Sequence, residues 1–225
     1  MSLPTDSAAP RPAPGRPKDP AKRAAILEAA ERMFLEHGFD GVSMDQIASA
    51  AGVSKLTVYS HFGDKDTLFI AAVEHYCGKQ VPESLFAPDP TRPMRPRLED
   101  IARAVLALMT SPESVSGFRL MCAPARRDPA LAEHFWRAGA GKLQDGFAAL
   151  LARRTAAGEL AIEDTARAAV DFFSLLRGDL HPRLILGSGI PAGFDMDAHV
   201  RGAVDTFLRA YAAVPGGAGR GRQAR

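Results

Sequence analysis

The chain has 225 residues, 46% hydrophobic and 24% charged, which is an ordinary composition for a soluble globular protein of one large or two small domains. The 28 Lys and Arg against 26 Asp and Glu give a net charge of +2, so bulk charge indicates no particular partner. No apolar run reaches the roughly 18 residues of a membrane span, the first 20 residues lack a secretory signal, and the two cysteines form no CxxC pair, which favours a cytoplasmic protein with reduced thiols.

The two ends of the chain differ in composition from the rest. Residues 1–18 are rich in proline and carry Arg11, Arg16 and Lys18, which predicts a disordered basic arm. Residues 215–225 read as a flexible basic tail. A basic arm can follow a phosphate backbone or enter a minor groove, or it can be an ordinary tail.

Helical periodicity dominates the remaining sequence and no period-2 strand pattern is found, so we predict an all-α fold. A first helix begins at Asp19-Pro20, an N-cap acceptor followed by proline, and ends at Gly38. Residues 43–46 read as a capping box that opens a second, short helix ending at Gly52.

A third short helix follows, between Ser54 and Gly63, and the pair makes a helix-turn-helix. If Val58 faces the core, the 100° step per residue turns mostly polar side chains outward or to the flank. Lys65 and amides near Ser43 can add phosphate contacts. A solvated bundle face is the alternative to a surface for phosphates and base edges. The candidate DNA contacts are Ser43, Lys55, Leu56, Thr57, Tyr59, Ser60, His61 and Lys65.

Longer helices are predicted in the second half of the chain. One follows a proline-rich connection at about residue 96, a shorter one carries Phe118, and a long one runs from Asp128-Pro129 to near Gly158. The next helix, 163–186, is apolar on two sides, with a kink expected at Pro182. The last covers about residues 196–214.

A helix that is apolar on two sides must be buried on two sides, and a second copy of the chain is the simplest second partner. We therefore predict that the last two helices form a four-helix dimer interface. A central position in a monomeric bundle is the alternative. The interface residues predicted are Ala168, Phe172, Leu175, Val204, Phe207, Leu208 and Tyr211.

The segment "SMDQIASAAGVSKLTVYSHFGDKDTL", preceded by "AAILEAAERMFLEHGFDGVS", resembles the TetR-type bacterial transcriptional regulators over about residues 20–75. The resemblance implies a homodimer that binds a near-palindromic double-stranded DNA operator, with one recognition helix in each major groove. Leu56 departs from the small residue or proline often found there, and could touch a thymine methyl. The C-terminal half, from "RLMCAPARRDPALAEHFWRAGAGKLQDGFAALLARRTAAGEL" to "AAVDFFSLLRGDL", is similar to the AefR-like subgroup.

The resemblance also implies a pocket for a small-molecule effector in the C-terminal half. An apolar or aromatic ligand is the expectation, because the candidate lining residues are aromatic or carry a thioether, although such residues fill cores as well. The ligand would hold the two DNA-binding domains of the dimer at a spacing that does not fit the operator. The candidates are Phe118, Met121, Phe135, Trp136 and Phe173.

An enzyme is the rival class, but the sequence offers no catalytic motif. The glycine-rich segment 187–193 lacks GxGxxG or Walker spacing, and the six histidines form no HExxH pair, so no metal and no cofactor are expected. His181 is the best single candidate for a buried polar role. We expect a helix-turn-helix domain over residues 19–65 and an effector-binding and dimerisation domain over 66–214, acting as a repressor. A helical interaction module with non-specific DNA binding is the alternative.

Overall fold

The computed structural model describes residues 19–213. The arm at 1–18 and the tail at 215–225 predicted from the sequence lie outside this part of the chain. Within it, every regular element is a helix, and the only strand-type pairing is an isolated antiparallel bridge between Leu160 and Ala212. The predicted all-α fold is confirmed.

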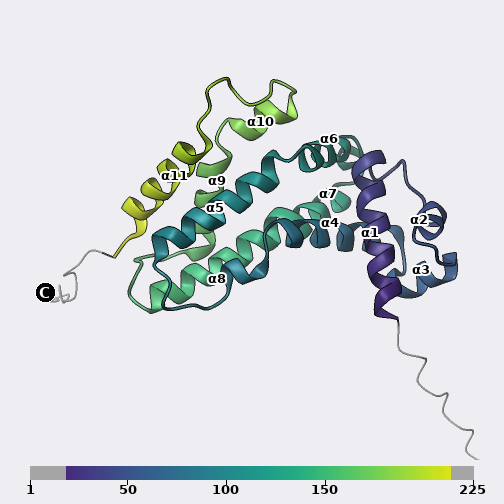
Figure 1. Ribbon diagram of the computed structural model, residues 1–225, viewed down its shortest axis with the longest axis horizontal. Helices are drawn as coiled ribbons and strands as arrows, with labels where there is room; N and C mark the ends of the chain where they lie inside the picture. Colours follow the sequence, from purple (N-terminus) through teal and green to yellow (C-terminus); the bar gives the residue numbers. More distant parts are fainter. Residues whose placement is uncertain (1–18, 214–225) are drawn as a thin grey trace, which may run out of the picture.

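Four helices build the N-terminal unit at one end of the molecule (Figure 1). Asp19 caps the first of them by accepting a hydrogen bond from the Ala21 amide at 3.0 Å, as the sequence predicted. A core of Ile26, Phe34 and Phe69 joins α1 to α4, so α4 belongs to this unit as well as to the C-terminal half. The helices are α1 (Pro20–His37), α2 (Met44–Ala50), α3 (Lys55–Phe62) and α4 (Lys65–Gln80).

The C-terminal half is a bundle built around a second core, in which Phe147, Phe172 and Phe207 are fully enclosed. Helix α9 packs on α8, α11 and α5, whereas α6 and α7 fill the space beside α1 and α4 (Figure 1). The elements are η1 (Glu83–Phe86), α5 (Met94–Thr110), α6 (Pro112–Arg127), α7 (Pro129–Trp136), η2 (Arg137–Gly141), α8 (Lys142–Ala156), α9 (Thr165–Arg177), α10 (Leu180–Ile185) and α11 (Met196–Tyr211).

The long helix predicted from Asp128 to Gly158 is continuous and contains one π-helical turn. Helix α7 passes into α8 through η2, a π-helical turn, and the backbone at Arg137 and Lys142 stays in the right-handed helical region. Two glycines, Gly139 and Gly141, lie in this turn. A π-turn inside an α-helix often marks a functional site, because it changes which side chains face a neighbouring element.

The single helix predicted over residues 163–186 is wrong, because the chain breaks it at Gly178. This glycine adopts φ 46° and ψ −138°, a left-handed conformation that ends α9 and turns the chain into α10. Pro182 was expected to cause a kink, but it lies in the first turn of α10, where its missing amide hydrogen removes no helical hydrogen bond.

The dimer-interface prediction also needs correction for four residues. The two apolar stripes of α9 are adjacent and form one face of about 160° at 3.6 residues per turn, which packs entirely on the same chain. The residues enclosed by their own chain are Ala168, Phe172, Val204 and Phe207, all at most 1% exposed. The other three, Leu175, Leu208 and Tyr211, are half-buried.

Two buried arginines hold the connection between α4 and α5. Arg97 is 2% exposed and donates to the Leu85 carbonyl from both Nε and Nη2, at 3.1 Å each. Arg154 is 4% exposed, donates to the Arg92 carbonyl at 2.8 Å and pairs with Glu159 at 2.6 Å. Backbone carbonyls thus satisfy most of these guanidinium donors, which is the condition for burying them.

Candidate nucleic-acid interface and the adjoining cavity

The helix-turn-helix is fixed by side-chain caps on both of its short helices. The Ser43 hydroxyl accepts from the Gln46 amide and the Gln46 side chain accepts from the Ser43 amide, which is the predicted capping box. Ser54 caps α3 by accepting from the Thr57 amide at 3.2 Å. Gly52 has φ 66° in the turn between them, a conformation that favours glycine. These contacts set the angle at which α3 leaves α2.

Helix α3 presents one side to the core and the other to solvent. Val58 and Phe62 are 0% and 5% exposed and anchor the helix to α1 and α4. On the opposite side, Leu56 is 79% and Tyr59 is 40% exposed, which is unusual for large apolar or aromatic side chains. The predicted orientation of the face therefore agrees with the structure: Ser43, Lys55 and Ser60 are also exposed, and Thr57, His61 and Lys65 are half-buried at its edges.

Several polar side chains on this face already hold local partners. Lys55 Nζ lies 2.9 Å from Asp45 on α2, and this hydrogen bond and charge raise the pKa of Lys55. The Thr57 and Ser54 hydroxyls are 2.8 Å apart, and the Ser60 hydroxyl donates to the Thr57 carbonyl at 2.9 Å. The face is thereby ordered before any partner arrives, although Lys55 has to leave Asp45 to reach a phosphate.

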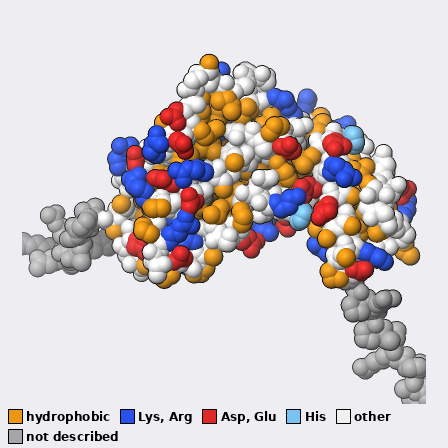
Figure 2. All heavy atoms as spheres, in the orientation of Figure 1, with side chains coloured by type: hydrophobic (Ala, Val, Ile, Leu, Met, Phe, Trp, Pro, Cys, Tyr) orange, Lys and Arg blue, Asp and Glu red, His pale blue; other side chains and the backbone are white. Residues whose placement is uncertain are grey.

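The edges of the face carry further donors. Burial lowers the pKa of Lys65, whose Nζ sits 4.3 Å from the centre of the Phe39 ring. The buried His61 Nδ1 has no hydrogen-bond partner among residues 19–213. Arg23 lies 5.1 Å from the centre of the Phe62 ring, so α1 adds a cation beside α3. Figure 2 shows basic and acidic side chains intermixed on the visible surface, not gathered into one basic surface.

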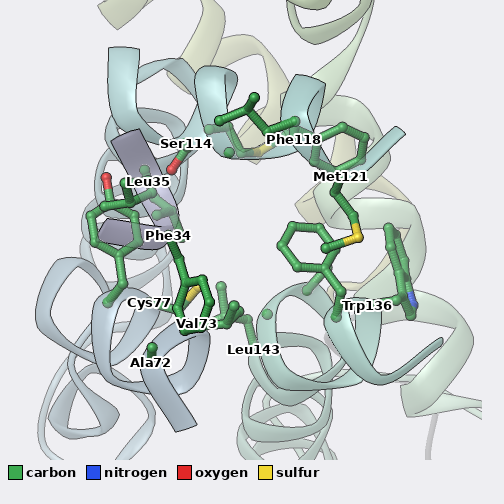
Figure 3. A pocket seen from close by; sticks show the side chains of 18 of the residues that line it. Phe34, Leu35, Ala72, Val73, Cys77, Ser114, Phe118, Met121, Trp136 and Leu143 are labelled. Atoms are coloured by element: carbon green, nitrogen blue, oxygen red, sulfur yellow. The ribbon is translucent and has the colours of Figure 1, made fainter. Parts of the chain in front are cut away.

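A cavity of about 200 Å³ lies between the helix-turn-helix unit and the bundle (Figure 3). Its wall is almost wholly apolar and is built from α1, α4, α5, α6, α7, η2, α8, α9 and α10. All five side chains predicted for a pocket lie on this one wall: Phe118, Met121, Phe135, Trp136 and Phe173.

The sequence did not identify the part of the wall that comes from the N-terminal unit. This part consists of Phe34 and Leu35 on α1, Phe39 just after α1, and Phe69 and Val73 on α4. In the sequence these positions are indistinguishable from core residues of the helix-turn-helix unit, and Phe34 and Phe69 do belong to its core. The π-turn η2 adds Gly139, whose missing side chain leaves room between η2 and α4.

A few polar groups interrupt the apolar wall. Glu31 on α1 is held by His75 at 2.8 Å and Lys79 at 2.7 Å, both on α4. Burial, and then the charge of Glu31, raise the pKa of the Cys77 thiol to about 11, so it stays protonated at neutral pH. His181, singled out in the sequence, lies on the wall with its ring edge-on to Phe118, 5.0 Å between ring centres.

Among residues 19–213, no helix combines the length and the apolar character that crossing a bilayer requires. In the same range, no three His, Cys, Asp or Glu side chains come together as a metal ion would need.

Comparison with known proteins assigns both halves of the chain. Residues 26–72 match the bacterial regulatory proteins of the tetR family, and residues 96–213 match the C-terminal domain of AefR-like transcriptional repressors. The repressor AcnR of Corynebacterium efficiens is 36% identical over 81 residues, which cover 36% of this chain and 43% of AcnR. The chain therefore matches less than half the length of that relative.

Solved structures extend the similarity over most of the chain. A TetR-family regulator from Mesorhizobium loti is 29% identical, with a TM-score of 0.69 over 85% of this chain and 96% of that one. The flavonoid-responsive regulator FrrA is 31% identical, with a TM-score of 0.67 over 85% and 97%. The fold, the helix-turn-helix and the two matched regions together show that the chain belongs to the TetR family of transcriptional regulators, with an AefR-like C-terminal domain.

Proposed function

We propose that this regulator is a homodimeric, cytoplasmic repressor that binds a near-palindromic double-stranded operator and leaves it when a small aromatic ligand binds. The observation that carries the proposal is the exposed face of α3, which a capped and ordered helix-turn-helix holds clear of the core. A second short helix exposed in this way fits a major groove, and the two copies of a dimer would read half-sites about 34 Å apart.

The proposed DNA contacts divide by chemistry. Lys55 and Lys65 supply cations for phosphates, and Ser43 lies at the start of α2, where amides point outward. Leu56 and Tyr59 are the large side chains that α3 exposes, and they suit base edges, with Leu56 matching a thymine methyl. The remaining contacts in the proposal are Thr57, Ser60 and His61.

The proposed dimer uses the outer faces of α9 and α11, since their inner faces are filled by the chain itself. Val170 is 39% exposed on the outer face of α9. Beside it, the Tyr211 hydroxyl of α11 donates to Asp171 at 3.3 Å, so the two helices form one continuous surface. Val170→Glu is expected to weaken the dimer in sedimentation equilibrium, because a carboxylate would be buried without a partner.

The cavity is the proposed effector site. Its wall includes α1 and α4, the helices that carry the helix-turn-helix, so a ligand there touches both halves of the molecule. Filling the cavity would favour one relative position of the two halves over others, and a ligand shifts this equilibrium by its difference in affinity for the two states. The aromatic wall and the similarity to a flavonoid-responsive regulator support an aromatic effector.

The test is fluorescence anisotropy on the DNA just upstream of the protein's own gene, with scrambled DNA alongside and a salt series. Two chains per site and affinity about 1000-fold above scrambled DNA would support a specific regulator. Tyr59→Ala should lose about 1–3 kcal/mol of operator affinity. Glu113→Ala, at an exposed position of α6 away from both the DNA-binding face and the proposed dimer surface, is the control and should lose none.

Two outcomes would contradict the proposal. If Tyr59→Ala binds as tightly as the wild type, α3 does not read the operator with this face. If genome-wide selection of bound fragments also finds only weak, salt-sensitive binding without sequence preference, the interaction-module alternative becomes the better explanation.

A further inference from the structure

The wall of the cavity carries a cation where α9 ends. Arg177 lines the cavity from the last turn of α9, and His181 lines it from α10, one turn beyond the break at Gly178. His181 follows Arg177 by four residues in the chain. Two side chains with nitrogen donors therefore line a cavity whose wall is mostly apolar.

Both side chains keep hydrogen-bonding groups that have no partner among residues 19–213. The Arg177 guanidinium makes one hydrogen bond, from Nη2 to the Ser174 hydroxyl at 3.3 Å. In residues 19–213 it has no carboxylate at ion-pair distance, although twelve other Lys, Arg and His side chains do. His181 is half-buried and makes no hydrogen bond within the described chain.

The one carboxylate on the wall belongs to a different part of it. Glu31 comes from α1, which packs on α4, α6 and α2, and its two oxygens are taken by His75 and Lys79. Arg177 and His181 come from α9 and α10, which pack on α8, α5 and α6. The carboxylate of Glu31 is thus paired with two basic side chains, whereas the Arg177 guanidinium, on the α9 side of the cavity, has no acidic partner among residues 19–213.

We propose that the effector is an aromatic acid, with its rings against the phenylalanine wall and its carboxylate held by Arg177 and His181. A planar guanidinium matches a carboxylate through two parallel hydrogen bonds. Burial, and then the charge of Arg177, lower the pKa of His181, so at neutral pH its imidazole is uncharged and can donate one hydrogen bond. This inference rests on the proposed function only in taking the cavity as the effector site.

The aromatic part of the ligand follows from the phenylalanines beside this polar pair. Phe118 lies edge-on to both His181 and Phe135, at 5.0 and 5.8 Å between ring centres, so the aromatic surface continues directly from the polar pair. A ring seated there would make the offset or edge contacts that aromatic groups prefer. A cavity of about 200 Å³ exceeds the roughly 150 Å³ of an engineered cavity that holds benzene, so one or two fused rings fit.

Calorimetric titration of the full-length protein with 2-naphthoate and with 2-naphthamide tests the proposal. The two probes have the same rings and differ in charge. The wild type should bind the acid about tenfold or more tightly than the amide, the size of effect expected of a charged hydrogen-bond pair. Arg177→Gln should remove this preference and leave amide binding unchanged, whereas Arg177→Lys should keep part of it.

Arg167→Gln is the matched control, because Arg167 lies on the exposed side of the same helix and pairs with Asp171 instead. It should keep the full preference for the acid. Protection of Cys77 from iodoacetamide by bound 2-naphthoate locates the ligand in the cavity, since Cys77 lies on its wall. Circular dichroism confirms that each variant is folded.

Three results would overturn the proposal: equal affinity for the acid and the amide, an unchanged preference in Arg177→Gln, or no binding of 2-naphthoate up to about 1 mM. Operator binding without ligand is measured separately by anisotropy. A protein that binds its operator but shows no preference for the acid would therefore reject this inference and leave the proposed repressor function standing.

Discussion

Replacement of Gly139 by alanine should make the protein more stable and its cavity smaller. Gly139 is buried in the π-turn η2 and has no left-handed backbone angle. A methyl group at this position would lie 3.7 Å from Val73 Cγ1 and 3.8 Å from Cys77 Sγ, which are ordinary van der Waals contacts. Both neighbours belong to the cavity wall, so the new methyl takes up space that a ligand would use.

The expected gain in stability has two sources. Alanine in place of glycine in a helix is worth about 0.5–1 kcal/mol, because the unfolded chain loses less freedom. Burying one methyl group adds about 0.8 kcal/mol. The sum, about 1–2 kcal/mol, corresponds to a rise in Tm of roughly 2–8 °C in a protein of this length. Gly78→Ala on α4 is the control: its position is exposed, no atom of residues 19–213 lies within 4 Å of the added methyl, and only the first source applies.

Urea unfolding gives the stability of both variants, and titration with 2-naphthoate gives their ligand affinity. Gly139→Ala should be the more stable of the two and bind the ligand less tightly than the wild type, whereas Gly78→Ala should bind it normally. Lower stability of Gly139→Ala than of the wild type would refute the packing argument, since the turn would then need glycine itself. Unchanged affinity would refute the cavity as the binding site.

Three further outcomes are expected. Gly52→Ala should lose about 1–2 kcal/mol in urea unfolding, because φ is 66° there and no neighbour obstructs the methyl; no loss would mean that the turn rearranges. Phe147→Ala should lose about 3–5 kcal/mol, since this side chain is 0% exposed and meets Phe86, Phe172, Phe173 and Phe207; a loss below about 1 kcal/mol would contradict its central place. Iodoacetamide should modify Cys77 slowly at pH 8 and about tenfold faster per pH unit up to its pKa of about 11, as mass spectrometry can follow, and rapid modification at pH 8 would contradict its burial.

The N-terminal unit could be predicted almost completely from the sequence, because its signals are local. Asp19, Ser43 and Ser54 each cap the helix that follows them, and Gly52 has the backbone angle for which glycine is preferred. Val58 then sets which side of α3 is buried, and the polar face follows from the helical repeat.

The bundle was predicted less well, because its features depend on contacts between distant segments. The two apolar stripes of α9 show that the helix is buried, but they do not show whether a second chain or α5, α8 and α11 of the same chain cover them. Because a second chain was expected, Phe172 and Phe207 were assigned to the dimer interface, whereas both lie in the core of their own chain. Pro182 is the more obvious helix breaker in the sequence, but the break comes at Gly178, which supplies the left-handed backbone angle. The five side chains expected in a pocket from the family resemblance line the cavity, whereas the α1 part of its wall was not expected, because Phe34 fits a core position equally well.

The arginine pair Arg97 and Arg154 makes the connection between α4 and α5 insensitive to alkali. Guanidinium groups keep their proton under all ordinary conditions, and the carbonyls of Leu85 and Arg92 accept hydrogen bonds without any proton of their own to lose. The surface link between Lys55 and Asp45 differs, because it depends on the proton of the Lys55 ammonium, whose pKa this contact raises. In strong alkali α3 should therefore lose this contact with α2, at the DNA-binding end of the molecule, while the two arginines still hold the 82–93 segment.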